Sequence, residues 1–130
     1  MWLLDASAFL KLLIVEPESA ELRRWIRGRD LASSDLLRTE ARRAVAGEPA
    51  DVRRRCEKLL AEIPMIRLVP AVLDRAGELP GQGLRSLDAI HLACALRLGD
   101  DLSGIVSYDA RQLAAADGLG IPTCSPGADL

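Results

Sequence analysis

Short apolar segments alternate with longer segments of helical periodicity along the whole chain. Residues 1–4 are uniformly apolar and stop abruptly at Asp5, which is typical of a strand covered on both faces. The same reasoning predicts short strands at residues 31–32, 65–69, 104–107 and 121–124. Helices are predicted at residues 6–15, 18–29, 35–46, 49–62, 70 onward, 87–98 and 109–117. Strands that alternate with helices in this way predict an α/β sandwich around a mainly parallel sheet.

Helix boundaries are predicted from capping and helix-breaking residues. Pro17 ends the first helix, because proline cannot continue the backbone hydrogen bonds of a helix interior. Ser33 and Ser34 offer an N-cap for the helix that follows them, and Ser86 offers one for the strongly apolar helix at 87–98.

Composition narrows the class of protein. A chain of 130 residues, with 49% hydrophobic and 28% charged residues, is expected to form a single domain over residues 1–130. Aromatic residues make up only 3%, which is too few for a nucleic-acid binder built on stacking platforms. No apolar run approaches the roughly 20 residues that span a bilayer, and no basic segment precedes the apolar N-terminus. These features predict a cytoplasmic protein without a membrane partner.

The cysteines favour the same compartment. Cys56, Cys94 and Cys124 are widely separated and form no Cys-x-x-Cys pair, and His91 is the only histidine. A zinc site is therefore not expected, and free thiols in a reducing compartment fit best.

The distribution of charge says more than its formal sum of −2, because nearly all the positive charge is arginine. The pairs Glu40 with Arg43 and Arg53 with Glu57 have helical spacing, so most of these arginines are interpreted as solvated helix faces. A minority could line a rim that contacts phosphates. The arginine clusters are Arg23, Arg24, Arg27 and Arg29, then Arg42 and Arg43, then Arg53, Arg54 and Arg55.

Four acidic residues adjoin apolar sequence instead of lying among other charges: Asp5, Glu40, Asp88 and Asp109. Each has a purely structural interpretation. Asp5 and Asp109 follow strands and could be N-caps, Asp88 lies in the first turn of a helix and could favour its dipole, and Glu40 could pair with Arg43.

Taken together, the four acids point to chemistry. Asp5 and Asp109 leave the carboxyl ends of strands, which meet at one edge of a parallel sheet. A helix that starts near this edge would bring Asp88 close, and Glu40 needs only to project inward. Gathered carboxylates repel one another unless a cation neutralises them, and oxygen-rich clusters suit Mg²⁺ or Mn²⁺. Such an ion activates water and stabilises charge on a phosphodiester, so hydrolysis of a phosphate ester is the natural reaction.

Other chemistries find less support. The chain has no Walker loop, no Gly-x-Gly-x-x-Gly and no Gly-x-Ser-x-Gly. His91 lies within an apolar helix, where it packs against neighbours or orients Asp88 one turn earlier. Ser7 and Ser107 each lie two residues from an acid, and either cap the backbone or donate a hydrogen bond to a carboxylate or to metal-bound water.

Four motifs in this order resemble those of PIN-domain ribonucleases, and the similarity is closest to the VapC toxins of bacterial toxin–antitoxin pairs. The resemblance covers essentially the whole chain. The motifs are Asp5-Ala6-Ser7-Ala8, Thr39-Glu40, Leu87-Asp88-Ala89-Ile90-His91-Leu92-Ala93 and Ser107-Tyr108-Asp109-Ala110-Arg111-Gln112-Leu113.

The resemblance implies a three-layer α/β/α sandwich with a central, mainly parallel sheet of about five strands. It also implies an endoribonuclease that depends on Mg²⁺, or on Mn²⁺ in its place, and that acts on tRNA or ribosomal RNA to arrest translation. By the same analogy Asp5, Glu40, Asp88 and Asp109 are catalytic metal ligands, and Ser107 is the hydroxyl near the last acid. Arg85 is a candidate contact for substrate phosphate or a loop-surface residue. Some members have a further acid that this chain lacks, which leaves the number of ions, one or two, open.

Relatives of this kind form homodimers and are silenced by a VapB antitoxin that wraps the toxin. The first two helices carry several large apolar residues, and these predict an apolar groove for the antitoxin. The alternative is that the same residues belong to the core. The residues concerned are Phe9, Leu13, Leu22 and Trp25.

Two other functions were compared with this one. A catalytically inactive PIN-like module that binds RNA or protein would have no reason to keep mutually repelling carboxylates. A receiver-type signalling domain would need an adjacent acidic pair near the first strand and a late lysine, and no lysine follows Lys58.

Overall fold

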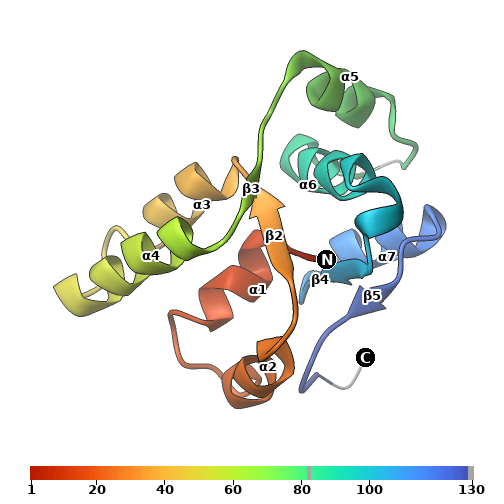
Figure 1. The fold of residues 1–130 in the computed structure, drawn as a ribbon. Coiled ribbons are helices and arrows are strands. Elements are labelled where there is room, and N and C mark those ends of the chain that lie inside the picture. The colour runs from red at the N-terminus through yellow and green to blue at the C-terminus, as the bar shows by residue number, and fades with distance from the viewer. Residues whose placement is uncertain (82, 129–130) are drawn as a thin grey trace.

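The computed structural model describes residues 1–81 and 83–128 and contains a five-stranded parallel sheet in the order β3-β2-β1-β4-β5 (Figure 1). All four strand pairs are parallel, and at the centre Leu3 pairs with Ala32 on one side and with Ile105 on the other. The predicted sheet is therefore confirmed. The strands are β1 (Trp2–Leu4), β2 (Leu31–Ser34), β3 (Met65–Ile66), β4 (Gly104–Val106) and β5 (Thr123–Cys124).

Helices cover both faces of the sheet, which gives the expected three layers (Figure 1). Successive strand residues alternate between the faces, so Leu4 and Val106 enter one core while Leu3 and Ile105 enter the other. The first core is closed by α1 (Ala6–Lys11), α2 (Ser19–Ile26), α3 (Leu37–Ala44) and α4 (Ala50–Glu62). The second is closed by α5 (Pro70–Glu78), α6 (Ser86–Arg97) and α7 (Ala110–Gly118), with a 3₁₀ turn, η1 (Gly99–Asp101), before β4.

The strand order reverses next to β1. The chain runs outward from β1 through β2 to β3, and then returns to place β4 on the other side of β1. The carboxyl ends of β1 and β4 therefore lie side by side at a switch point, where parallel sheets commonly bind ligands. Asp5 directly follows β1, and Ser107 directly follows β4.

The first helix is shorter than predicted. It ends at Lys11 rather than near residue 15. The Ser19 hydroxyl donates to the carbonyl of Lys11 at 2.7 Å and so satisfies a group that a longer helix would have used. A side chain distant in sequence, and not Pro17 alone, sets this boundary.

The two serine caps were predicted wrongly. Ser33 and Ser34 belong to β2 and are fully buried, and the Ser33 hydroxyl donates to the Leu4 carbonyl at 2.7 Å. Ser34 accepts from the amide of Leu36, one residue before α3 begins. Ser86 is the first residue of α6, and the residue that precedes it, Arg85, is the N-cap.

Gly104 is required by close packing in β4. A Cβ atom at this position would lie 2.4 Å from the Pro122 carbonyl oxygen and 2.6 Å from Cζ3 of Trp2. We expect Gly104→Ala to lower the free energy of unfolding by about 1–3 kcal/mol, because backbone and an indole ring must move. Denaturant unfolding followed by circular dichroism measures this change. The matched control is Gly77→Ala in α5, where a Cβ meets nothing within 4 Å, and about 0.4–1 kcal/mol of stabilisation is expected. Equal stability of the two variants would contradict this packing.

Candidate active site

Asp5 is the most buried of the four candidate acids, with 4% of its surface exposed. Its Oδ1 accepts hydrogen bonds from the Ser7 hydroxyl at 2.6 Å and from the Ala8 amide at 3.0 Å, and its Oδ2 accepts one from the Ser107 hydroxyl. Burial raises the pKa of Asp5, although the hydrogen bonds from Ser107, Ser7 and Ala8 act in the opposite direction. Asp5 is thus the N-cap of α1, and it also places a carboxyl group at the switch point.

Ser7 and Ser107 join the two chain segments that meet there. Each hydroxyl donates to Asp5 and accepts from the backbone of the β4–α7 connection: Ser7 from the Tyr108 amide at 2.9 Å, and Ser107 from the Asp109 amide at 3.1 Å. The two hydroxyl oxygens lie 3.4 Å apart. Both serines therefore hold Asp5 in place.

Asp88 and Asp109 contribute charge to the same region. Burial raises the pKa of Asp88, and repulsion from Asp109 and from Asp5 raises it further, while His91 and Arg85 lower it. Asp109 caps α7 by accepting from the amide of Arg111 at 2.9 Å. Among the charges that act on Asp88, that of Asp109 has the largest effect, which indicates that the residue after β4 lies near the start of α6.

Glu40 and His91 form a contact that the sequence analysis did not predict. His91 Nε2 lies 2.5 Å from Oε1 of Glu40, and His91 is 2% exposed. Since a carboxylate only accepts, Nε2 carries the proton. The interpretation of Glu40 as a surface partner of Arg43 is therefore wrong, and His91 orients Glu40 rather than Asp88. The spacing of Asp88 and His91 showed only that they share a face of α6 and gave no signal for Glu40, which is 51 residues away.

Arg85 is exposed at the start of α6, and its charge lowers the pKa of Asp88. Arg85 therefore lies near Asp88. The charges of Asp109 and Asp5 thus both act on Asp88, and Glu40 contacts His91, whose charge lowers the pKa of Asp88.

The arrangement was tested for its fit to a divalent ion. In the described part of the chain, no three Asp, Glu, His or Cys side chains lie close enough together to hold a metal ion by themselves. Mg²⁺, however, keeps several waters and binds through one or two carboxylates. The donors here are oxygen atoms whose mutual repulsion a cation would relieve, and Nδ1 of His91 is buried without a hydrogen-bond partner within residues 1–81 and 83–128. A hydrated Mg²⁺ or Mn²⁺ ion fits these residues, whereas a dehydrated cage of protein ligands does not.

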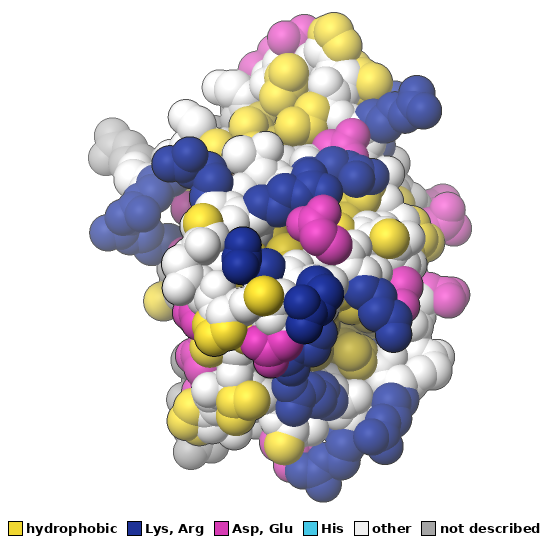
Figure 2. Space-filling model, turned by 90° about the vertical axis from the view of Figure 1, so that its left-hand side faces the viewer, with side chains coloured by type: hydrophobic (Ala, Val, Ile, Leu, Met, Phe, Trp, Pro, Cys, Tyr) yellow, Lys and Arg dark blue, Asp and Glu magenta, His cyan; other side chains and the backbone are white. Residues whose placement is uncertain are grey.

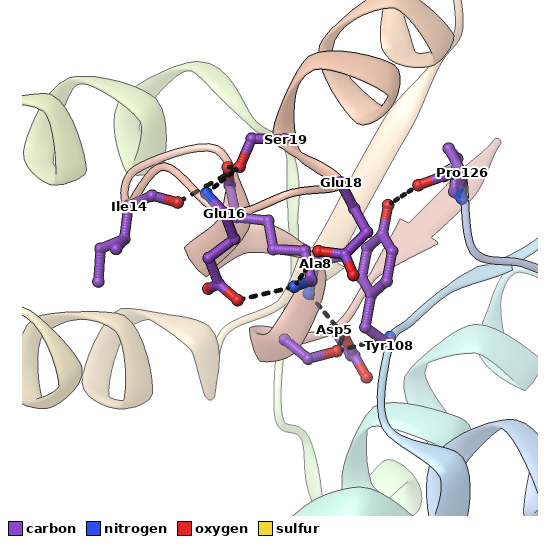
Figure 3. A network of polar contacts seen from close by, with 10 residues as sticks. Asp5, Ala8, Ile14, Glu16, Glu18, Ser19, Tyr108 and Pro126 are labelled. Atoms are coloured by element: carbon purple, nitrogen blue, oxygen red, sulfur yellow. Dashed lines mark hydrogen bonds and ion pairs between the residues drawn. The ribbon is translucent and has the colours of Figure 1, made fainter. Parts of the chain in front are cut away.

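A second polar network beside the site was missed by the sequence analysis (Figure 3). Nζ of Lys11 lies 2.9 Å from a carboxylate oxygen of both Glu16 and Glu18, and 4.8 Å from the centroid of the Tyr108 ring. The Tyr108 hydroxyl donates to the Pro126 carbonyl at 2.6 Å, and burial raises its pKa to about 12. Tyr108, which lies between Ser107 and Asp109, is thus in contact with α1 through Lys11 and with the C-terminal segment through Pro126. Lys11 in turn binds the segment after α1 through Glu16. A lone lysine in an apolar helix was the available signal.

The residues predicted to form an antitoxin groove are mostly internal. Phe9 and Leu22 are fully buried and Leu13 is 2% exposed, all in the core beside α1. Trp25 is half-buried, and its ring contacts Trp2 edge-on at 4.9 Å between centroids. Leu13 also borders a groove of about 240 Å³ between the end of α1 and α4, and Leu12, Arg55, Lys58, Leu59 and Glu62 complete its lining.

A parallel sheet with acids gathered at its switch point is the architecture of the PIN-domain class. The sequence profile of the PIN domain matches residues 2–119, and the chain belongs to this family. Within the family it is similar to proteins named ribonuclease VapC, as the resemblance had predicted. In Mycobacterium tuberculosis, ribonuclease VapC46 is 44% identical over 124 residues, which is 95% of each chain. Ribonuclease VapC47 is 42% identical over 132 residues, 96% of each chain.

A solved structure supports the same fold. The structure of VapC20 from Mycobacterium tuberculosis, described as a toxin that cleaves the sarcin–ricin loop, superposes with a TM-score of 0.78. The match covers 97% of this chain and 100% of that one, at 13% sequence identity. The chain therefore has a PIN fold, belongs to the PIN-domain family and is similar over most of its length to proteins named ribonuclease VapC. Within the described residues, no helix combines the length and the apolar character needed to cross a membrane.

Proposed function

We propose that the chain is a metal-dependent endoribonuclease that hydrolyses phosphodiester bonds of tRNA or ribosomal RNA and so inhibits translation. The observation that supports this proposal is that Asp5 and Asp109 follow the neighbouring strands β1 and β4, and that the charges of both raise the pKa of Asp88. A protein without a cationic ligand gains nothing from carboxylates that repel one another.

Each residue has a distinct role in this proposal. Asp5, Asp88 and Asp109 would hold a hydrated Mg²⁺ ion, or Mn²⁺ in its place, in part through its water molecules, and Glu40 acts beside them, oriented by His91. The ion, when bound, lowers the pKa of water and stabilises charge on the phosphodiester. Ser7 and Ser107 fix the Asp5 carboxylate through their hydroxyls, and Arg85 holds a phosphate of the RNA.

The substrate proposal is tested by incubating the purified chain with total tRNA and with ribosomal RNA, each with Mg²⁺, Mn²⁺ or EDTA. We expect discrete products with either ion and none with EDTA. Arrest of a cell-free translation reaction under the same conditions tests the effect on translation. Intact RNA in all reactions, from a folded protein that binds RNA, would instead favour the catalytically inactive PIN-like binding module.

We further propose that residues 1–130 form one PIN domain, and that the protein acts in the cytoplasm as a homodimer.

We also propose that a VapB-type antitoxin neutralises the chain. The groove between the end of α1 and α4 supports this proposal, since Leu12, Leu13 and Leu59 line it and Arg55 and Lys58 border it. Val15, 76% exposed, follows the same segment. An amphipathic segment with apolar anchors and acidic neighbours is complementary to this surface.

Trp25 is half-buried and is the least buried member of the predicted antitoxin contact. We expect Trp25→Ala to weaken antitoxin binding about thirtyfold, because truncated aromatic anchors typically cost about 2 kcal/mol or more. Titration of labelled antitoxin measures the affinity, and thermal unfolding confirms that the variant is folded. Leu73→Ala, on α5 and 42% exposed, is the control and should bind normally. Unchanged affinity in folded Trp25→Ala would remove Trp25 from the interface.

A further inference from the structure

The hairpin of α3 and α4 carries a local excess of positive charge. Residues 38–58 hold seven Lys and Arg against four Asp and Glu, while the rest of the chain holds ten against fifteen. Figure 2 looks onto this side of the molecule, where Lys and Arg side chains gather across the surface. Arg38, also exposed on α3, is paired with Asp35. We call the six other exposed cations of the hairpin the arginine face; they are Arg42, Arg43, Arg53, Arg54, Arg55 and Lys58.

The arginine face surrounds a groove of about 510 Å³ between the two helices. Arg42, Arg53 and Arg54 line it, together with Glu57 and a floor of Val45, Ala46 and Ala50. Arg42 is held by two parallel hydrogen bonds to Glu57, from Nη2 at 2.9 Å and from Nε at 3.0 Å. The expected pair of Arg53 with Glu57 is therefore replaced by Arg42 with Glu57, and in the described part of the chain Arg53 and Arg54 form no ion pair.

The chemistry of the groove selects phosphate. Guanidinium groups present planar pairs of donors that match phosphate oxygens, and a groove with two unpaired guanidinium groups attracts anions. Residues 37–62 contain no aromatic residue, so this surface has no ring on which an unpaired base could stack. A surface without stacking rings can still contact the sugar–phosphate backbone, and base-paired RNA is recognised largely through its shape and backbone. The groove therefore favours a base-paired RNA segment over unpaired bases.

The arginine face, through Arg43 and not through the groove itself, extends toward the candidate active site along α3. Glu40, which contacts His91, and Arg43 lie one turn apart on the same helix, separated by about 4.5 Å along its axis. An RNA that contacts Arg43 therefore lies within one helical turn of Glu40.

We propose that the arginine face binds the phosphate backbone of a base-paired RNA segment that flanks the cleavage site. The inference rests on the proposed function, because it deepens the description of the RNA substrate. The chain is then a ribonuclease that selects structured RNA: the hairpin of α3 and α4 holds a stem, and the acids act on the strand that leaves it.

Binding can be tested without cleavage by using Asp5→Asn protein in EDTA and a fluorescein-labelled RNA stem–loop. Fluorescence anisotropy gives the affinity over a range of salt concentrations. We expect the additional double change Arg53→Glu with Arg54→Glu to weaken binding at least about tenfold and to reduce the salt slope by about 2. Arg75→Glu with Arg97→Glu, two exposed arginines on α5 and α6, alters the net charge equally and should retain binding within about threefold.

The remaining outcomes each decide the proposal. Arg53→Lys with Arg54→Lys should keep most of the affinity, and circular dichroism verifies the fold of every variant. Equal RNA affinity of the Arg53→Glu, Arg54→Glu protein and the Arg75→Glu, Arg97→Glu protein would overturn the proposal. If the Arg53→Glu, Arg54→Glu protein lost affinity for the antitoxin but not for RNA, the groove would instead bind a protein partner, and the proposal would also be overturned. Tighter binding of unpaired oligouridine than of the stem–loop would overturn the preference for paired RNA. Cleavage by the wild-type protein is measured separately, so an inactive protein that still binds through the arginine face would contradict only the proposed function.

Discussion

Replacing Asp5 by asparagine is expected to slow RNA cleavage about 10³-fold or more while leaving the protein folded. Loss of a metal ligand removes several kcal/mol of transition-state stabilisation, and each ~1.4 kcal/mol corresponds to a factor of ten in rate. The asparagine oxygen can still accept from Ser7 and Ala8, and its nitrogen can donate to Ser107 once that hydroxyl turns. Single-turnover cleavage of a defined RNA measures the rate.

The same variant should be more stable than the wild type when metal is removed. Burial raises the pKa of Asp5, so the folded protein binds this proton more tightly than the unfolded chain does. The ionised carboxylate therefore opposes folding at neutral pH, and this destabilisation fades as pH falls from above the raised pKa toward the ordinary value of 3.8. Asp5→Asn removes both the destabilisation and its pH dependence. Thermal unfolding in EDTA at neutral and mildly acidic pH measures the two effects.

A matched control separates the loss of a ligand from the loss of a charge. Asp74→Asn, exposed on α5, changes the net charge equally and should cleave RNA at the wild-type rate. If folded Asp5→Asn also cleaved at that rate, Asp5 would be only the N-cap of α1.

Replacing Phe9 by alanine is expected to lower the free energy of unfolding by about 3–5 kcal/mol, a large share of the roughly 5–15 kcal/mol typical of a domain. Phe9 is fully buried between β1 and the helices that cover its face of the sheet. The cost combines the lost burial of the ring with the cavity that remains. Chemical denaturation followed by circular dichroism measures it.

This prediction separates a core residue from an interface residue. Val15→Ala, at a position 76% exposed, should change stability by no more than about 0.5 kcal/mol. The folded fraction of Phe9→Ala should bind the antitoxin with wild-type affinity, so that any loss of binding equals the fraction of protein that is unfolded. A stable Phe9→Ala protein with weakened antitoxin binding would contradict the burial of Phe9 and restore it to the interface.

The sheet and the positions of two acids could be predicted because their signals are local. A uniformly apolar strand that ends at Asp5 fixes where that carboxyl emerges, and the carboxyl ends of parallel strands share one edge. Because Asp109 also follows a strand of the parallel sheet, its place at the same edge could be predicted without knowing any side-chain contact.

The contact between Glu40 and His91 could not be predicted in the same way. The two residues are 51 positions apart and lie on helices whose relative placement depends on the packing of both cores. Sequence spacing alone favours a helical pair of Glu40 with Arg43. Only the fold shows that Glu40 instead contacts a buried histidine.

The antitoxin groove illustrates a second limit. An apolar stripe on a helix shows that a face is covered but does not show whether the cover is the chain's own core or a partner. Leu22 and Phe9 are covered by the core, whereas Leu12 and Leu13 also border an open groove. Ser33 shows that a polar residue can be equally ambiguous. Serine is typical of a helix cap, but Ser33 is buried in β2, where its hydroxyl donates to the Leu4 carbonyl.

The central claim is that Asp5, Asp88 and Asp109 hold the ion that RNA cleavage requires. The most direct test is the single-turnover rate of cleavage of one defined RNA against Mn²⁺ concentration, for the wild-type protein and for Asp88→Asn. We predict no cleavage in EDTA, a wild-type rate that saturates with Mn²⁺, and an Asp88→Asn rate that is lower and needs more Mn²⁺. Cleavage that persists in EDTA, or an identical Mn²⁺ dependence in folded Asp88→Asn, would contradict the claim.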